Sequence, residues 1–141
     1  MDLDKKSKEL FSKFLREHQY TDIKDTDEIS QYYTFDILAN RDGKKYAFEL
    51  KDRNCKSTSY GDIMCEKHKY DVAVNKINSG EYDAVFVVNF YTDGVFAICH
   101  IYLGKEKLMF CPKTTSFKNR EYEQKKMWLM PQKQIFEYDR E

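Results

Sequence analysis

The segment Tyr33–Arg53, which reads YTFDILANRDGKKYAFELKDR, limits the possible folds of this chain more than any other segment. Apolar and polar residues alternate on either side of Asp42-Gly43, and a period of two is typical of a β-strand with one buried face. Asp-Gly is favoured in tight hairpin turns because glycine adopts positive φ at little cost. The segment therefore predicts a β-hairpin, and a two-residue loop would place Asp36 directly opposite Glu49.

The two faces of this hairpin differ in chemistry. One face carries an unbroken apolar stripe, whose burial would fix the strand register: Phe35, Ile37, Ala39, Tyr46, Phe48 and Leu50. The other face brings together two acids and a lysine, Asp36, Glu49 and Lys51. A four-residue loop over residues 40–43 would change the pairing but not this shared face. The polar face is therefore where we expect chemistry.

Two carboxylates held side by side repel each other, and proteins usually offset that cost with a bound cation or a shared proton. Carboxylate oxygens are ligands that suit Mg²⁺ or Mn²⁺. A lysine beside such a cation places positive charge where a reacting phosphate accumulates negative charge. This combination indicates phosphodiester hydrolysis. The alternative is an amphipathic hairpin whose solvated face happens to carry Asp, Glu and Lys.

The spacing also resembles a known motif. Phe35-Asp36, twelve intervening residues and then Glu49-Leu50-Lys51 are similar to the PD-(D/E)xK motif of the restriction-endonuclease-like nuclease superfamily, although Phe35 stands where that motif often has proline. The resemblance implies an α/β fold with a restriction-endonuclease-like core, a mixed β-sheet flanked by helices in an αβββαβ-type order. It implies that residues 1–141 form a single domain of this kind.

The resemblance also implies a site and an activity. Asp36, Glu49 and the backbone carbonyl of Leu50 would bind Mg²⁺ or Mn²⁺, and Asp36, Glu49 and Lys51 would be catalytic. The expected activity is that of a metal-dependent DNA endonuclease, either Holliday-junction-resolvase-like or associated with phage or defence. Such nucleases often act as homodimers, and the motif requires no organic cofactor. The alternatives are a catalytically inactive relative that binds nucleic acid or a partner protein, and a phage or mobile-element protein that inhibits a host factor.

The first predicted helix spans residues 4–20, with an apolar stripe at helical spacing formed by Leu10, Phe11, Phe14 and Leu15. Many relatives carry a glutamate on this helix that reaches the active site. Glu9 matches by its position, yet it lies nearly opposite the apolar stripe and should face solvent. Asp4 lies closer to the buried face, where it could equally be an N-cap.

The second predicted helix spans residues 62–78, with Asp62 as N-cap and Ser79-Gly80 as the stop. Its core stripe consists of Ile63, Tyr70, Val74 and Ile77. The resembling nucleases send one polar residue of this helix toward the metal site. Glu66 and Lys67 are the candidates for that role, with Lys67 nearer the stripe, and the alternative is that both are surface residues.

The remaining elements follow from local patterns. Residues 82–91 are nearly all apolar or β-branched, which predicts a strand at the centre of the sheet, and residues 95–103 predict its hairpin partner after Thr92-Asp93-Gly94. The other expectations are a polar connection over 20–31, edge strands over 107–111 and 126–130, and a terminal helical turn over 132–138. Ser57, Thr58, Ser59 and Tyr60, before the second helix, could hydrogen-bond a phosphate.

The composition bears on where in the cell the protein is expected. The N-terminal sequence MDLDKKSKEL is too charged for a signal peptide, and no run approaches the ~20 apolar residues that span a bilayer. We therefore expect a soluble cytoplasmic protein with no membrane partner and with reduced thiols at Cys55, Cys65, Cys99 and Cys111. Cys65-x2-His68 with Cys99-His100 has poor spacing for zinc, because Cys99 and His100 are adjacent on a predicted strand and point to opposite faces.

The charge distribution bears on DNA binding. A formal net charge of +0 is not typical of a protein that binds DNA through its phosphates. Residues 104–133 nevertheless contain more basic than acidic side chains, interleaved with Phe117, Tyr122 and Trp128. The basic residues are Lys105, Lys107, Lys113, Lys118, Arg120, Lys125, Lys126 and Lys133, against Glu106, Glu121 and Glu123. This tract could contact a nucleic-acid backbone, and the alternative is an ordinary solvated surface.

Overall fold

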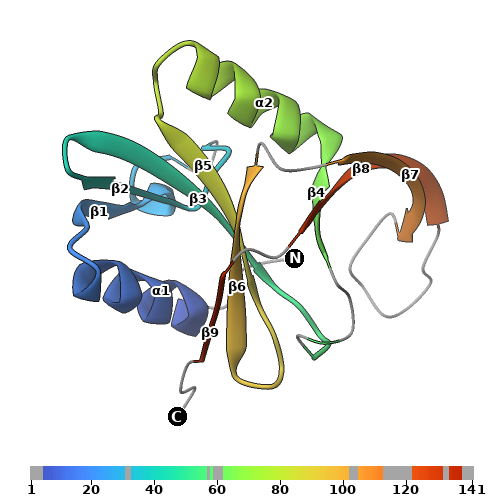
Figure 1. Cartoon of the computed structure of the whole chain (residues 1–141), viewed down its shortest axis with the longest axis horizontal. Helices are drawn as coiled ribbons and strands as arrows, with labels where there is room; N and C mark the ends of the chain where they lie inside the picture. Colours follow the sequence, from blue (N-terminus) through green and yellow to red (C-terminus); the bar gives the residue numbers. More distant parts are fainter. Residues whose placement is uncertain are drawn as a thin grey trace.

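A computed structural model describes residues 5–30, 33–56, 58, 62–101, 105–112, 122–131 and 134–137. In chain order the elements are α1 (Lys5–Glu17), β1 (Thr21–Asp25), the 3₁₀ helix η1 (Thr26–Glu28), β2 (Ile37–Arg41), β3 (Lys44–Asp52), β4 (Asp62–Glu66), α2 (Lys67–Asn78), β5 (Ala84–Phe90), β6 (Val95–His100), β7 (Lys105–Pro112), β8 (Tyr122–Pro131) and β9 (Gln134–Glu137). A six-stranded mixed sheet has the order β1-β2-β3-β5-β6-β9, and β4-β8-β7 form a smaller sheet. The predicted α/β fold class is therefore confirmed (Figure 1).

The hairpin β2–β3 has the predicted two-residue turn. Asp42 and Gly43 have φ values of 53° and 76°, and two positive φ angles define the type I′ turn whose twist matches that of the strands. Ile37 pairs with Phe48 and Arg41 with Lys44, which is the register expected for that loop. The local turn chemistry and the burial of one face thus agree on a single pairing.

The strand β5 lies at the centre of the large sheet, as its apolar sequence predicts. It pairs in parallel with β3, from Tyr46 opposite Ala84 to Asp52 opposite Phe90, and antiparallel with β6. Parallel neighbours need a crossover connection, and here the crossover passes through β4 and α2. The helices α1 and α2 lie on opposite faces of the sheet (Figure 1).

Each face of the sheet has its own core. The α1 face buries Phe11, Leu15, Ile37, Ala39, Phe48, Leu50, Val88, Phe90, Phe96 and Ile98. The α2 face buries Phe35, Ala47, Cys65, Tyr70, Ala73, Tyr82, Val85, Val87, Tyr91, Ala97, Cys99 and Ile101. The strict alternation along β3 therefore separates Phe48 and Leu50, in one core, from Glu49 and Lys51, which point toward α2.

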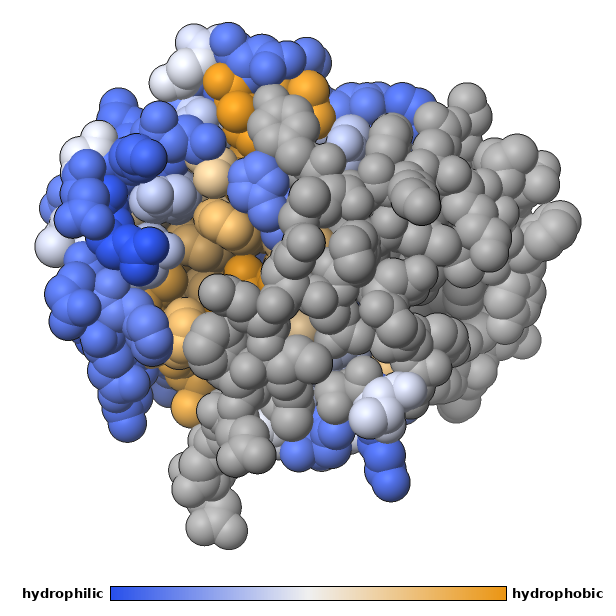
Figure 2. Space-filling view, viewed as in Figure 1, coloured by the Kyte–Doolittle hydropathy of each residue, from blue (hydrophilic) through white to orange (hydrophobic). Residues whose placement is uncertain are grey.

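The helix α1 covers only part of its face. Hydrophobic residues are visible between polar ones in the left half of Figure 2. A pocket of about 520 Å³ opens on this side, lined by Phe14, Leu15, His18, Tyr20, Arg41, Phe48, Phe86, Ile98 and His100. Asp36, Glu49 and Lys51 do not line this pocket, so it is separate from the acids and the lysine of the hairpin.

Two expectations for the helices need correction. Residues 62–66 form strand β4 rather than the start of the second helix, and Glu66, not Asp62, is the N-cap residue of α2. β4 pairs with β8, for example Cys65 with Trp128, and this long-range pairing overrides the local helical pattern. The predicted stop is confirmed, since Ser79 is the C-cap residue and Gly80 has φ of 82°.

Three expectations for the strands also need correction. Residues 20–31 contain the edge strand β1, and residues 134–137 form strand β9 beside β6 rather than a helical turn. Residues 107–111 and 126–130 lie within β7 and β8 of the small sheet, where β7 is an edge strand as predicted and β8 is the central strand. Short polar edge strands show little alternation, and their partners are distant in sequence, so local patterns do not reveal them.

Several predicted features lie outside the described residues: Asp4, Ser57, Ser59, Tyr60, Lys113, Phe117, Lys118, Arg120, Glu121 and Lys133. Cys55, Cys65 and Cys99 form no disulfide in the described part of the chain. None of the helices in the described part of the chain is both long and apolar enough to span a membrane.

Candidate active site

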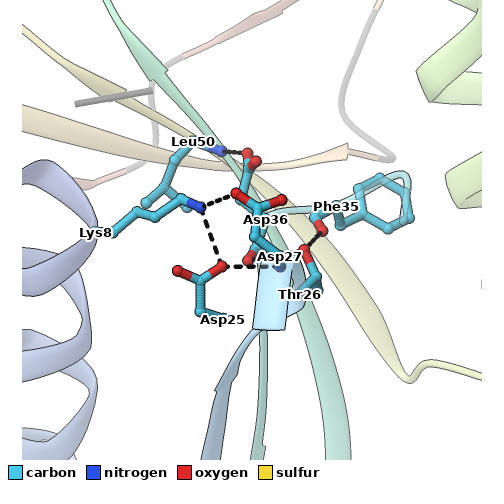
Figure 3. A network of polar contacts seen from close by, with 7 residues as sticks. All are labelled: Lys8, Asp25, Thr26, Asp27, Phe35, Asp36 and Leu50. Atoms are coloured by element: carbon cyan, nitrogen blue, oxygen red, sulfur yellow. Dashed lines mark hydrogen bonds and ion pairs between the residues drawn. The ribbon is translucent and has the colours of Figure 1, made fainter. Parts of the chain in front are cut away.

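Asp36 is held in place by its backbone and its side chain. Its N–H donates to the Phe48 carbonyl at 2.9 Å, and its carbonyl accepts from the Thr26 N–H at 3.0 Å and the Thr26 hydroxyl at 3.1 Å. Its carboxylate Oδ2 accepts the Leu50 N–H at 2.8 Å (Figure 3). Thr26 is 2 % exposed, which shields its own bonds from water, and the bond from the Leu50 N–H gives the Asp36 carboxylate a defined position at the edge of β3.

The end of β2 explains this geometry. β2 begins at Ile37, so beyond that residue the edge of β3 meets the Asp36 side chain instead of a paired strand. The N–H and carbonyl of one strand residue point to the same edge, so the Leu50 carbonyl points toward the side occupied by Asp36. The bend before β2 also corrects the predicted apolar stripe, because Phe35 packs in the α2-face core rather than with Ile37.

Glu49 is a buried acid with one oxygen unpaired. Its side chain is 5 % exposed, and Oε1 lies 2.8 Å from the Lys69 Nζ and 3.7 Å from the Lys51 Nζ. Oε2 is buried and has no hydrogen-bond partner among the described residues. Burial, reinforced by the nearby negative charge of Asp36, raises the pKa of Glu49 to about 7, although Lys69 and Lys51 oppose the shift.

Lys69 was missed by sequence reasoning. Of the two candidates from this part of the chain, Lys67 pairs with Asp71 at 2.8 Å and Glu66 is exposed, whereas Lys69 contacts Glu49. Burial is the largest single influence and lowers the pKa of Lys69, but the charge and hydrogen bond of Glu49, together with the charges of Asp36 and Glu66, outweigh it and the net pKa is raised. Lys69 precedes the buried Ala73 by four residues, so counting this alanine as part of the core stripe would have placed the lysine on the inward face.

Glu9, the candidate on α1, is exposed. The same helix nevertheless contributes indirectly through Lys8, whose Nζ lies 3.0 Å from Asp25 and 2.8 Å from Asp27. These acids flank Thr26, and the Asp25 carboxylate also accepts the Asp27 N–H at 3.0 Å, which caps η1 (Figure 3). A chain of contacts therefore runs from α1 through η1 to the backbone of Asp36.

The oxygen atoms at this position fit a hard divalent cation. They are the carboxylates of Asp36 and Glu49, including the unpaired Oε2, and the Leu50 carbonyl. No group of three or more His, Cys, Asp and Glu side chains that could hold a metal ion occurs in the described part of the chain, so Cys65, His68, Cys99 and His100 form no such group. Two carboxylates with a backbone carbonyl are the ligand set that the resemblance to the PD-(D/E)xK motif led us to expect.

Comparison with known proteins adds evidence on the fold. No family profile matches the sequence, and no curated protein sequence is significantly similar to it. The structure is similar to that of Hjc, a Holliday junction resolvase from the archaeal hyperthermophile Archaeoglobus fulgidus, with a TM-score of 0.54 and 10 % sequence identity over 87 % of this chain and 81 % of that chain. At this identity the likeness concerns the fold alone. The chain has the α/β fold with a restriction-endonuclease-like core that was predicted from the order of its helices and strands.

Proposed function

We propose that this protein is a Mg²⁺- or Mn²⁺-dependent DNA endonuclease. The observation that carries the proposal is the buried Glu49 carboxylate, with one oxygen unpaired, close enough to Asp36 for the Asp36 charge to raise its pKa. Structural ion pairs normally satisfy both oxygens, because an unpaired buried acceptor costs about 1–3 kcal/mol. The likeness to a resolvase supports the same reading at the level of the fold.

Asp36, Glu49 and the Leu50 carbonyl would hold the cation. A divalent ion there supplies Lewis-acid stabilisation of a phosphate oxygen and lowers the pKa of a water. Lys51, whose side chain is 42 % exposed, projects from the same face of β3 and can reach a bound phosphate. Its ammonium group would stabilise the negative charge that develops at phosphorus and orient the attacking water.

Lys69 has a different role in this proposal. It is less exposed than Lys51, at 26 % against 42 %, and it lies closer to Glu49. It compensates the charge of Glu49 before a cation binds, since a buried carboxylate without a partner would take up a proton instead. Lys69 thus keeps Glu49 available as an anionic ligand near neutral pH.

DNA contact would extend beyond the site. Strands β7 and β8 carry four lysines of the basic tract: Lys105, Lys107, Lys125 and Lys126. The small sheet adjoins α2 through β4, so it flanks the helix that carries Lys69. We propose this sheet as a contact for the phosphate backbone, and the homodimer expected of such nucleases remains a prediction that light scattering can test.

The proposal is tested by incubating the protein with supercoiled plasmid and with a synthetic four-way junction, each with Mg²⁺, Mn²⁺ or EDTA. We expect nicking or resolution with either metal, none with EDTA, and none for Asp36→Asn. Lys67→Ala serves as a control, because Lys67 pairs with Asp71 away from Glu49. A wild type that binds DNA but cleaves neither substrate with any metal would instead identify a catalytically inactive member of this fold.

A further inference from the structure

Arg53 continues the polar row of the hairpin. Its N–H donates to the Phe90 carbonyl at 2.8 Å, which extends the ladder between β3 and β5 one residue beyond Asp52. Since side chains alternate along an extended chain, Arg53 follows Glu49 and Lys51 on the face toward α2. Three side chains with charged groups therefore stand in line along one face of one strand.

The guanidinium of Arg53 has no hydrogen bond or ion pair with any side chain in the described part of the chain, although the residue is partly buried. The nearest acid in sequence, Asp52, points to the opposite face, where it accepts the Ser7 hydroxyl at 2.6 Å. Burial lowers the pKa of Arg53 from its ordinary value. A partly buried cation that forms no ion pair is costly, and an anionic ligand would remove that cost.

The strand beside Arg53 offers no carboxylate to its side chain. Across the ladder, Asn89 lies opposite Lys51, and the next residue pair brings Tyr91 beside Arg53, so the adjoining strand supplies an amide and a phenol rather than a carboxylate. Four residues of strand separate Arg53 from Glu49, which corresponds to about 13 Å between their α-carbons. The negative charge of Glu49 still acts to raise the pKa of Arg53, although the two side chains form no ion pair in the described part of the chain. Arg53 therefore lies beside the carboxylate site rather than in it, which suits a second phosphate on the same strand.

We infer that Arg53 binds a non-scissile backbone phosphate of the DNA strand, one or two nucleotides from the phosphate held at Asp36 and Glu49. The planar guanidinium presents two parallel N–H donors to such a group, which a lysine cannot do. This subsite would set the direction in which the strand crosses the site. The inference rests on the proposed function, because it takes the scissile phosphate to lie at the carboxylates.

The test measures DNA binding without cleavage. Fluorescence anisotropy with a labelled duplex in EDTA, over a series of salt concentrations, compares Asp36→Asn with Asp36→Asn/Arg53→Gln, Asp36→Asn/Arg53→Lys and Asp36→Asn/Arg41→Gln. Arg41 is the matched control, because it lies 4.5 Å above the Tyr20 ring on the opposite face of the sheet. One lost phosphate contact reduces the slope of log K against log salt by about 0.9.

We expect Arg53→Gln to weaken binding several-fold and to reduce the salt slope by about 1, Arg53→Lys to restore the slope but not the full affinity, and Arg41→Gln to change neither. In duplexes that carry one uncharged methylphosphonate, its placement at one particular position should weaken DNA binding by Asp36→Asn but not by Asp36→Asn/Arg53→Gln. Equal effects of the Arg53 and Arg41 changes, an unchanged slope, or no such position would overturn the inference. If Arg53→Gln fails to fold, DNA binding by Asp36→Asn/Arg53→Lys to the same methylphosphonate duplexes takes its place in the test. If the Arg53 changes alter DNA binding as expected but the wild type never cleaves DNA, the nuclease proposal would be overturned and the phosphate subsite would stand.

Discussion

The Nζ atom of Lys69 lies 2.8 Å from Oε1 of Glu49, so a helix that is remote in sequence holds one oxygen of the acid contributed by the hairpin. Lys51 lies 3.7 Å from the same oxygen. Together with Asp36, these groups form two acids and two ammonium groups, whose formal charges cancel when all are ionised. The two ammonium groups therefore already balance the negative charge of the acids before a divalent cation binds at Oε2. Tight binding of that cation requires Glu49 to be ionised.

The metal prediction concerns the two carboxylates. Calorimetric titration with Mn²⁺ should show binding to wild type that is lost in Asp36→Ala and in Glu49→Ala, because each change deletes a hard oxygen ligand. Asp71→Ala is the matched control, since Asp71 is exposed and pairs with Lys67. Equal heats for all four proteins would rule out this site.

A second prediction separates the two lysines. Lys51→Ala should abolish cleavage while Mn²⁺ affinity and melting temperature stay close to wild type, because an ion pair exposed at the lysine contributes little stability. Lys69→Ala should retain cleavage at high pH and lose it toward neutral pH, because removing the ammonium raises the pKa of Glu49 further.

The comparison needs cleavage rates from pH 6 to pH 9, chosen as roughly one unit or more on either side of the Glu49 pKa. Lys67→Ala should follow the wild-type profile. Identical profiles for Lys69→Ala and Lys67→Ala would show that Lys69 does not control the ionisation of Glu49.

A third prediction concerns stability without metal. Glu49 has a pKa of about 7 in the folded protein against 4.5 ordinarily, so between these values the folded state retains a proton that the unfolded state has lost. The resulting stabilisation is complete below pH 4.5 and is lost as pH rises through 7, by about 3 kcal/mol as an order of magnitude. Urea denaturation in EDTA should show wild type losing stability relative to Glu49→Gln over this range. Parallel curves for the two proteins would contradict the raised pKa.

The hairpin could be predicted from the sequence because every determinant is local. The Asp42-Gly43 turn and the alternation of β2 and β3 depend on residues within one short segment. The central strand β5 could be predicted because a nearly continuous apolar run has few alternatives.

The rest depends on contacts that the sequence does not display. β4 is a strand because β8 pairs with it, and the start of α2 shifts accordingly, which exchanges Lys67 for Lys69 as the inward lysine. The inward face of α2 is instead marked by the buried Ala73, four residues after Lys69, and a small residue gives a weak signal in an apolar pattern. Thr26 was missed for a similar reason, because a polar connection gave no sign that it contained a buried residue.

The last prediction tests whether Thr26 positions Asp36. Its hydroxyl donates to the carbonyls of Phe35 and Asp36, and its N–H also donates to Asp36 (Figure 3). Thr26→Val keeps the N–H and the side-chain shape but removes the hydroxyl, which should lower stability by about 1–2 kcal/mol. If the hydroxyl also fixes the Asp36 carboxylate, Mn²⁺ affinity measured well below the melting temperature should fall several-fold.

Thr26→Ser restores the hydroxyl and should recover Mn²⁺ affinity, although the lost methyl group leaves stability below wild type. Lys8→Met provides a second comparison, because it releases Asp25 and Asp27 without touching the Asp36 bonds directly. It should weaken Mn²⁺ binding less than Thr26→Val does, since the effect must pass through η1. Thr26→Val with lowered stability but wild-type Mn²⁺ affinity would show that Thr26 stabilises the fold only, and that the Leu50 N–H is sufficient to hold the Asp36 carboxylate.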